Sequence, residues 1–238
     1  MKSAIRSVAL LAVGLALISG CAEAGGGTSS ADPTETIISD LPPASLEALM
    51  QAAIEADDLA QVEAILEAGL DPADYPDNEV TPLHRAAAGN YPDIVRVLVA
   101  AGADLEARTG RRTPLMLAAA SDAGEASAAL IELGADVEAQ DPGFFGATPM
   151  HFAAQFGGLA SLEAMIGEGV PVDIVDADGS TPLLYAAIFG QADAAEYLLD
   201  CGADVNARDG GGDTPLRVTD RNAYPELAQL LEDVGGVV

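Results

Sequence analysis

Apolar and polar positions repeat with a spacing of about 33 residues from residue 81 to the end of the chain. Each copy begins with threonine, proline and an apolar residue, and a glycine follows 21 residues after the threonine. The copies begin at Thr81, Thr113, Thr148, Thr181 and Thr214. The matching glycines are Gly102, Gly134, Gly169, Gly202 and Gly235. Five coincident pairs at one fixed offset indicate a tandem repeat.

Each copy predicts two short helices. Threonine caps the free N–H groups at a helix start, and proline fits the first turn because its missing N–H is not needed there. In the copy beginning at Thr81, Leu83, Ala86 and Ala87 give the first helix a small apolar face. The second helix carries an apolar stripe of helical period, formed by Ile94, Val95, Leu98 and Val99.

The connection between the two helices of a copy requires a left-handed backbone, which Gly, Asn and Asp tolerate best. The aligned positions hold Asp57, Asn90, Asp122, Gly157, Gly190 and Ala223. Five of the six residues therefore suit this conformation. The departure falls in the last copy, and terminal repeats of such arrays are atypical.

The Thr-Pro motifs and their glycines resemble the ankyrin repeat, and the resemblance covers about residues 45–238. It implies an all-α solenoid of helix-turn-helix units joined by hairpin-like turns. We expect about six repeats, the first of them degenerate, at residues 45–80, 81–112, 113–147, 148–180, 181–213 and 214–238. Two additional residues around Asp141, Pro142 and Gly143 lengthen one turn. No copy buries its apolar face alone, so stacking supplies the core.

The N-terminus has the features of a secretory signal: Lys2 and Arg6 precede an apolar stretch from Val8 to Ile18, which is too short to span a bilayer. Residues 18–21, Ile-Ser-Gly-Cys, resemble the bacterial lipobox. That resemblance implies removal of residues 1–20, lipidation of Cys21, and a lipid-anchored protein of the bacterial cell envelope. Ala22 in place of aspartate favours the periplasmic face of the outer membrane. The alternative is an ordinary signal cleaved nearby.

Residues 21–44 have no helical or strand period and are rich in Gly, Ser, Thr, Pro and acidic residues, which predicts a flexible tether. The whole chain has 10 basic and 38 acidic residues, a net charge of −28. Such a chain would repel nucleic-acid phosphates and anionic lipid headgroups, which excludes most nucleic-acid binding and basic-patch membrane docking. The overall charge favours a cationic or neutral partner.

The sequence offers little chemistry. The two histidines, His84 and His151, occupy the fourth motif position, where the ankyrin resemblance implies a structural hydrogen-bonding role. The stretches around Asp176 and Asp178 and around Gly210 are interpreted as turns rather than as calcium or phosphate loops. We therefore expect no catalytic residue, no cofactor and no metal, and the chain is not expected to be an enzyme. Cys201 is expected to be a partly buried free thiol.

The family resemblance implies a concave partner surface, made by turn tips and by exposed positions late in the first helices. Four phenylalanines fall at such positions of two adjacent copies: Phe144, Phe145, Phe156 and Phe189. Exposed aromatic patches mark interfaces. The alternative is that the long turn folds Phe144 and Phe145 back onto the stack. The fifth phenylalanine, Phe152, is expected to pack between repeats.

Three arginines, Arg108, Arg111 and Arg112, lie in the turn before this patch. They can pair with carboxylates on a partner or with the acidic residues of the chain itself. The sequence thus predicts a monomeric binding protein whose partner is another protein. The alternatives are a structural spacer without a partner, or an envelope immunity or stress-protection protein.

Overall fold

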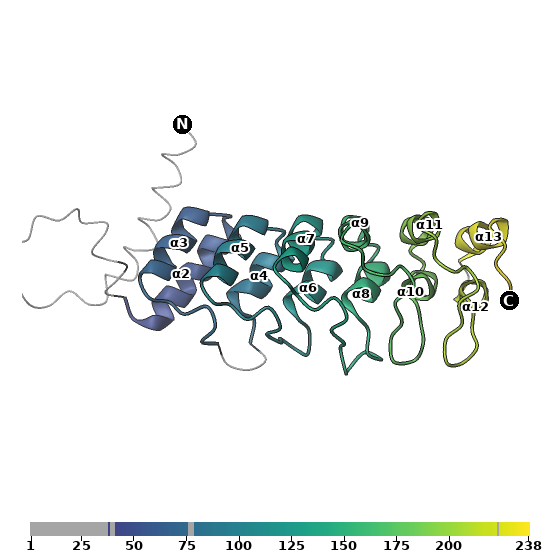
Figure 1. Cartoon of the computed structure of the whole chain (residues 1–238), viewed down its shortest axis with the longest axis horizontal. Coiled ribbons are helices and arrows are strands. Elements are labelled where there is room, and N and C mark those ends of the chain that lie inside the picture. Colours follow the sequence, from purple (N-terminus) through teal and green to yellow (C-terminus); the bar gives the residue numbers. More distant parts are fainter. Residues whose placement is uncertain (1–37, 39–40, 76–78, 223) are drawn as a thin grey trace, which may run out of the picture. The chain divides into compact units, whose positions relative to one another are not determined.

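We describe the protein from a computed structural model, which describes residues 38, 41–75, 79–222 and 224–238 (Figure 1). The predicted signal at 1–20, Cys21 and most of the predicted tether lie outside the described residues. Within the described part, the chain forms 12 helices and no strand, which confirms the all-α prediction. None of these helices has the length and apolar character that crossing a membrane requires.

The helices form six consecutive pairs. The first helices are α2 (Pro43–Glu55), α4 (Pro82–Ala88), α6 (Pro114–Ala120), α8 (Pro149–Phe156), α10 (Pro182–Phe189) and α12 (Pro215–Asn222). The second helices are α3 (Leu59–Glu67), α5 (Pro92–Ala100), α7 (Gly124–Glu132), α9 (Leu159–Gly167), α11 (Ala192–Asp200) and α13 (Pro225–Asp233). Helix α2 begins at Pro43, two residues before the expected start of the repeats at residue 45.

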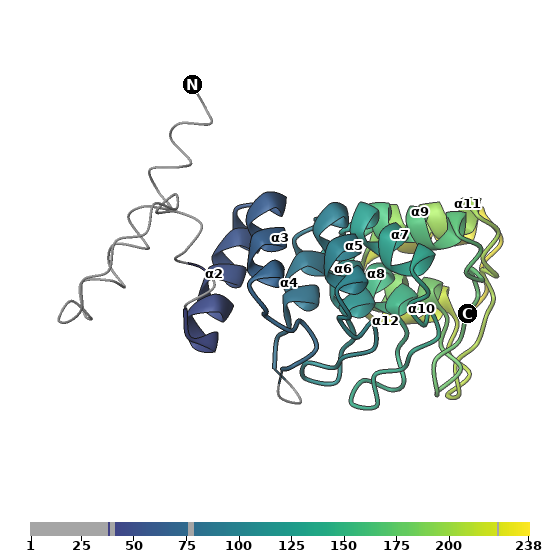
Figure 2. The same ribbon diagram turned by 60° about the vertical axis from the view of Figure 1, so that its left-hand side comes forward.

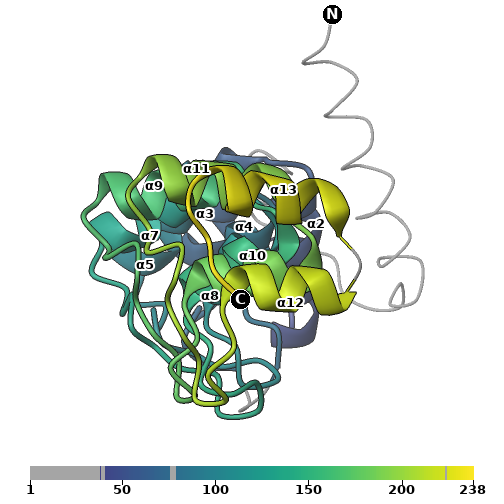
Figure 3. The ribbon, with the colours of Figure 1, turned by 90° about the vertical axis from the view of Figure 1, so that its right-hand side faces the viewer.

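Each row of helices occupies one side of the stack, and the turns between repeats project beyond the first helices (Figures 1 and 2). The view along the stack shows the first helices between the second helices and the turns (Figure 3). Neighbouring first helices pack against each other, as do neighbouring second helices. The first helices and the turns therefore form one continuous face, which we call the turn face.

The expected helix starts are present. The threonine hydroxyl accepts a hydrogen bond from the backbone N–H three residues later in four copies, at Thr81, Thr113, Thr181 and Thr214. In the remaining copy, Nδ1 of His151 accepts a hydrogen bond from the backbone N–H of Thr148 and also contacts its hydroxyl. Because these bonds satisfy N–H groups that a helix leaves free, each copy specifies its own helix start.

The residues predicted to be left-handed have positive φ values, from 52° at Asp57 to 73° at Gly157, whereas Ala223 lies outside the described residues. Two of these residues also connect repeats. Asn90 Oδ1 accepts a hydrogen bond of 2.9 Å from the N–H of Ala126, and Asp122 Oδ1 accepts one of 3.2 Å from the N–H of Ser161. These polar side chains therefore shape one repeat and bind the next.

Buried alanines and leucines form the core, as in Leu83, Ala86 and Ala87, each with no exposed area. The close packing of α7 on α9 depends on a glycine. A Cβ on Gly124 would lie 2.7 Å from the carbonyl oxygen of Ala160, well inside van der Waals contact. The two helices thus approach each other over a backbone surface that only glycine leaves open.

Candidate functional site

The histidines connect neighbouring turns. Nδ1 of His84 lies 2.8 Å from the Thr81 hydroxyl, and Nε2 lies 3.1 Å from the carbonyl oxygen of Arg112 in the next turn. A carbonyl only accepts, so Nε2 carries the proton and Nδ1 accepts from the hydroxyl. His151 bonds in the same way to Thr148 and to the carbonyl of Ser180. Burial lowers the pKa of both imidazoles, which keeps them neutral in this role.

The long turn that ends the third repeat, residues 141–147, is held by Asp141 and presents two phenylalanines. The backbone N–H groups of Phe144 and Gly146 donate to the Asp141 carbonyl, and the N–H of Gly143 donates to its carboxylate at 2.8 Å. Asp141 itself is 4 % exposed. A buried carboxylate therefore fixes the turn that carries the aromatic residues, which we call the aromatic turn.

The two phenylalanines of the aromatic turn have different environments. Phe144 is partly buried, and its ring centroid lies 5.9 Å from that of Phe152 and 6.1 Å from that of Tyr185. Phe145 has a left-handed backbone with φ of 52°, and its side chain is 70 % exposed. The sequence left two alternatives for this pair, an exposed patch or a turn folded back onto the stack. Each alternative describes one residue: Phe144 folds back onto the stack, and Phe145 projects from it.

The other phenylalanines lie where the motif positions placed them. Phe152 is fully buried, which confirms its packing between repeats. Phe156 and Phe189 end α8 and α10 and are 50 % and 38 % exposed. The ring of Phe189 lies 6.3 Å from that of Tyr185 and so joins the cluster, whereas Phe156 pairs with no aromatic ring in the described residues.

Tyr185 links this cluster and is absent from the sequence-based site. It contacts the rings of Phe144, Phe189 and His151, and its hydroxyl donates a 2.8 Å hydrogen bond to Oδ2 of Asp176. Burial, and the adjacent Asp176 carboxylate, raise its pKa. The sequence feature that could have identified Tyr185 is its position, because it occupies the same motif position as Phe152 in the preceding copy.

Asp176 serves as a turn residue, as the sequence interpretation held. Its Oδ1 accepts hydrogen bonds from the backbone N–H groups of Asp178, at 2.8 Å, and Ser180, at 2.9 Å. In the described part of the chain, no three His, Cys, Asp or Glu side chains are grouped so that they could hold a metal ion. Cys201 is partly buried at the end of α11.

The three arginines of the preceding turn differ in their contacts. Arg108 donates to the carbonyl oxygens of Arg111, at 2.7 Å, and Gln140, at 2.9 Å. The Arg112 guanidinium lies 4.6 Å above the Phe152 ring centre, and its Nε is 3.8 Å from the Asp141 carboxylate. The Arg111 guanidinium lies against Gly143, where a Cβ would overlap it.

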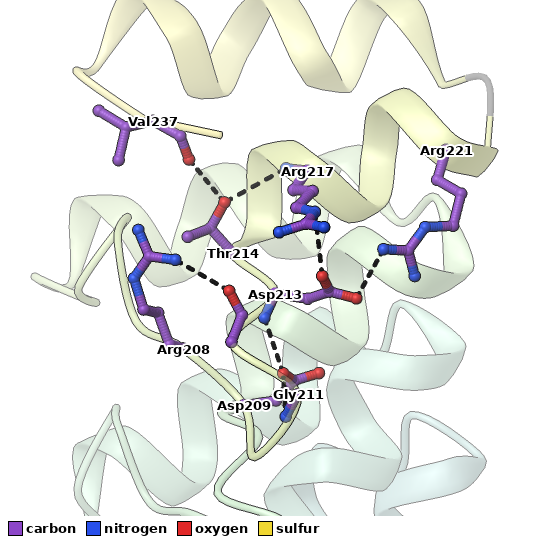
Figure 4. Close-up of polar contacts among 9 residues, drawn as sticks. Arg208, Asp209, Gly211, Asp213, Thr214, Arg217, Arg221 and Val237 are labelled. Carbon is purple, nitrogen blue, oxygen red and sulfur yellow. Dashed lines mark hydrogen bonds and ion pairs between the residues drawn. The ribbon is translucent and has the colours of Figure 1, made fainter.

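A second arginine cluster, in the last repeat, is one that the sequence-based site does not include (Figure 4). Arg217 and Arg221 contact the Asp213 carboxylate at 3.1 Å and 2.7 Å, and Arg208 donates to the Gly212 carbonyl at 2.8 Å. The Thr214 hydroxyl also donates to the carbonyl of Val237. These contacts tie the last turn to the terminal helix pair, so the cluster has an evident structural use.

A comparison with protein-family models finds ankyrin repeats (3 copies) at residues 49–141 and again at residues 130–209. Together the two matches cover more than half of the chain. No curated protein matches the sequence.

Proposed function

The chain belongs to the ankyrin-repeat family, and from that premise we propose that it binds a partner protein through the aromatic turn and its neighbours on the turn face. Ankyrin repeats in general support protein–protein interaction, and the family is typically not enzymatic. The observation that carries the proposal is Phe145, a large apolar side chain that is 70 % exposed at a turn tip. Exposed aromatic residues of this kind are frequent anchors of binding energy.

The surface around Phe145 is larger than one ring. The ring centroid of Phe144 lies 6.0 Å from that of Phe145. Phe144 also contacts Tyr185, which in turn contacts the exposed Phe189. Phe156, half-exposed at the end of α8, adds a further exposed apolar side chain between these repeats along the chain. Arg111 and Arg112 line a groove that Phe144 also lines. The stacked repeats hold these side chains in place before binding, which lowers the entropy cost of association.

We also propose that the protein works at the bacterial cell envelope, held by lipid on Cys21 and connected to the repeats by the tether at 21–44. The support is the lipobox-like sequence at 18–21 and the signal-like segment before it. Several acyl chains on one residue would anchor the chain stably. In this proposal the turn face searches for its partner near the periplasmic face of the outer membrane.

The anchor is tested by expressing the full chain and its Cys21→Ser variant in a bacterial host. We expect the wild type to fractionate with membranes and its N-terminal peptide to have the mass of a lipidated cysteine. The variant should lose both properties. An unmodified Cys21, or a mature N-terminus at another residue, would refute the anchor without affecting the binding proposal.

Binding is tested by cross-linked capture from envelope extract, with wild type beside Phe145→Ala. Val234→Ala is the matched control, because Val234 is also an exposed apolar residue, 49 % accessible, but lies after the last helix. We expect capture of one protein that Phe145→Ala loses and Val234→Ala retains. Failure of wild type to capture any protein would favour a spacer, and the identity of a captured protein would separate an immunity role from a stress-protection role.

A further inference from the structure

We propose that the partner segment bound beside the aromatic turn is acidic, with a carboxylate that pairs with Arg111 and an apolar residue that contacts Phe145. The inference rests on the proposed function and narrows it, because it specifies the chemistry of the bound segment. It runs against the overall charge of the chain, −28, which favours a cationic partner. The local arrangement of charge is what supports an anionic one.

An open groove of about 500 Å³ lies between the aromatic turn and the turn before it. Val80, Leu117 and Phe144 give it apolar walls, and Arg111 and Arg112 supply two positive charges. Asp141 is the one carboxylate among its described lining residues. That carboxylate is 4 % exposed and already accepts the Gly143 N–H beside the Arg112 contact. The surface open to a ligand is therefore apolar and positive.

Arg111 is the arginine that remains available to a ligand. Arg108 is bonded to two carbonyl oxygens, and Arg112 is placed by Phe152 and Asp141. The Arg111 side chain is exposed and has no hydrogen bond or ion pair with any other described residue. A guanidinium presents paired N–H donors that match a carboxylate, and such charge-assisted bonds are among the stronger polar contacts.

The backbone conformation at these turn tips also supports the inference. Arg111 has φ of 77° and Phe145 has φ of 52°, in the left-handed region where glycine is the favoured residue. A non-glycine residue in this conformation is strained, and such strained residues concentrate at functional sites. Two adjacent turn tips thus carry large side chains in a conformation that glycine would adopt without strain. This arrangement is explained if the side chains of Arg111 and Phe145 contact the same bound segment.

Acidic residues are also absent from the helices flanking the groove. The first helices α4, α6, α8 and α10 contain no Asp or Glu, whereas every second helix contains at least one. Among these helices the carboxylates lie on the second row, whereas the turns carry further exposed carboxylates, such as Asp104, Asp136 and Glu138. The lining of the groove and the first helices beside it are thus poor in carboxylates, and repulsion from the exposed carboxylates of the turns is screened over about 8–10 Å at physiological salt.

The probe is a phage-displayed library of random 12-residue peptides, selected on the wild-type protein, followed by fluorescence binding of the most enriched synthetic peptide. We expect enriched peptides to combine Asp or Glu with an aromatic or branched apolar residue. Arg111→Gln should weaken binding about tenfold, equivalent to about 1.4 kcal/mol, and added salt should weaken wild-type binding. Arg96→Gln is the control of equal charge change, because Arg96 lies on α5 and pairs with Glu132. It should change affinity less than twofold.

A second variant tests the geometry without removing charge. Gly143→Ala places a methyl group where the Arg111 guanidinium lies, so it should also weaken the acidic peptide. Enrichment of apolar peptides without acidic residues, or equal binding by Arg111→Gln, would overturn the inference and leave the proposed function standing. Failure to enrich any peptide that Phe145→Ala loses would overturn both. Self-association of the wild type that Phe145→Ala abolishes would assign the groove to a second copy of this chain and overturn the acidic segment.

Discussion

Replacing Phe144 and Phe145 separately should divide stability from binding. Phe144 contacts three aromatic rings at centroid distances of 5.9 to 6.1 Å, whereas Phe145 is 70 % exposed and has one ring neighbour among the described residues, Phe144. An alanine at 144 removes a ring that packs on the stack. An alanine at 145 removes a ring that meets solvent. The two substitutions are chemically identical, so any difference between them reports the surroundings.

The expected magnitude follows from the buried area. Complete burial of a phenylalanine side chain contributes about 1.5–3 kcal/mol, and packed aromatic pairs add about 0.5–1.5 kcal/mol. Because Phe144 is partly exposed, Phe144→Ala should lower the free energy of unfolding by about 2–3 kcal/mol. That is below the roughly 3–5 kcal/mol typical of truncating a fully buried phenylalanine. About a third of the Phe145 surface is buried, so truncating it to alanine should lower the free energy of unfolding by about 1 kcal/mol or less.

The assay is thermal and urea unfolding followed by far-ultraviolet circular dichroism. For about 200 residues, 1 kcal/mol shifts Tm by about 2–4 °C, so Phe144→Ala should melt about 4–12 °C lower. Phe145→Ala should melt within about 4 °C of the wild type. Phe156→Ala is a control, since Phe156 is half-exposed and pairs with no other described ring. Equal melting of the 144 and 145 variants would refute the packing argument.

Two further predictions concern the stack itself. Gly124→Ala should lower the free energy of unfolding by about 1–3 kcal/mol, because its Cβ would lie 2.7 Å from the Ala160 carbonyl; Gly167→Ala, with open space around its Cβ, should be neutral or stabilising in the same urea titration. Burial lowers the pKa of His84 and His151, so their contribution to stability is complete above about pH 6.5 and is lost as the pH falls toward the folded-state pKa values. Urea midpoints at pH 7.5 and 5.5 should therefore differ more for the wild type than for a variant with both histidines replaced by glutamine, and equal differences would contradict the linkage.

The sequence alone determined the repeat architecture because its signals are local. A Thr-Pro pair specifies a helix start through bonds and dihedral preferences within one turn of chain. Asp57, Asn90 and Asp122 specify left-handed connections for the same reason, and all three adopt them. The histidine role also follows from the motif, since Thr81 and His84 are three residues apart and bond directly.

Only the tertiary structure separated Phe144 from Phe145. The two are adjacent in sequence and equally apolar, so no periodicity inside a turn distinguishes them. Their difference depends on Asp141, which fixes the turn, and on Tyr185, which comes from α10, two repeats further along the chain, and supplies the surface on which Phe144 rests. Packing between repeats is set by residues about 33 to 41 positions apart, and local preferences carry no information about such contacts.

The same limit applies to the arginines. The sequence placed Arg108, Arg111 and Arg112 in one turn but did not assign their partners. In the structure, Arg108 bonds to a carbonyl of the next turn, Arg112 lies over Phe152, and Arg111 remains exposed. Composition and spacing determine which charges are near each other along the chain. Which charge stays available to a ligand is decided by the groups that other repeats bring to it, because an ion pair or a cation–π contact depends on distance in space.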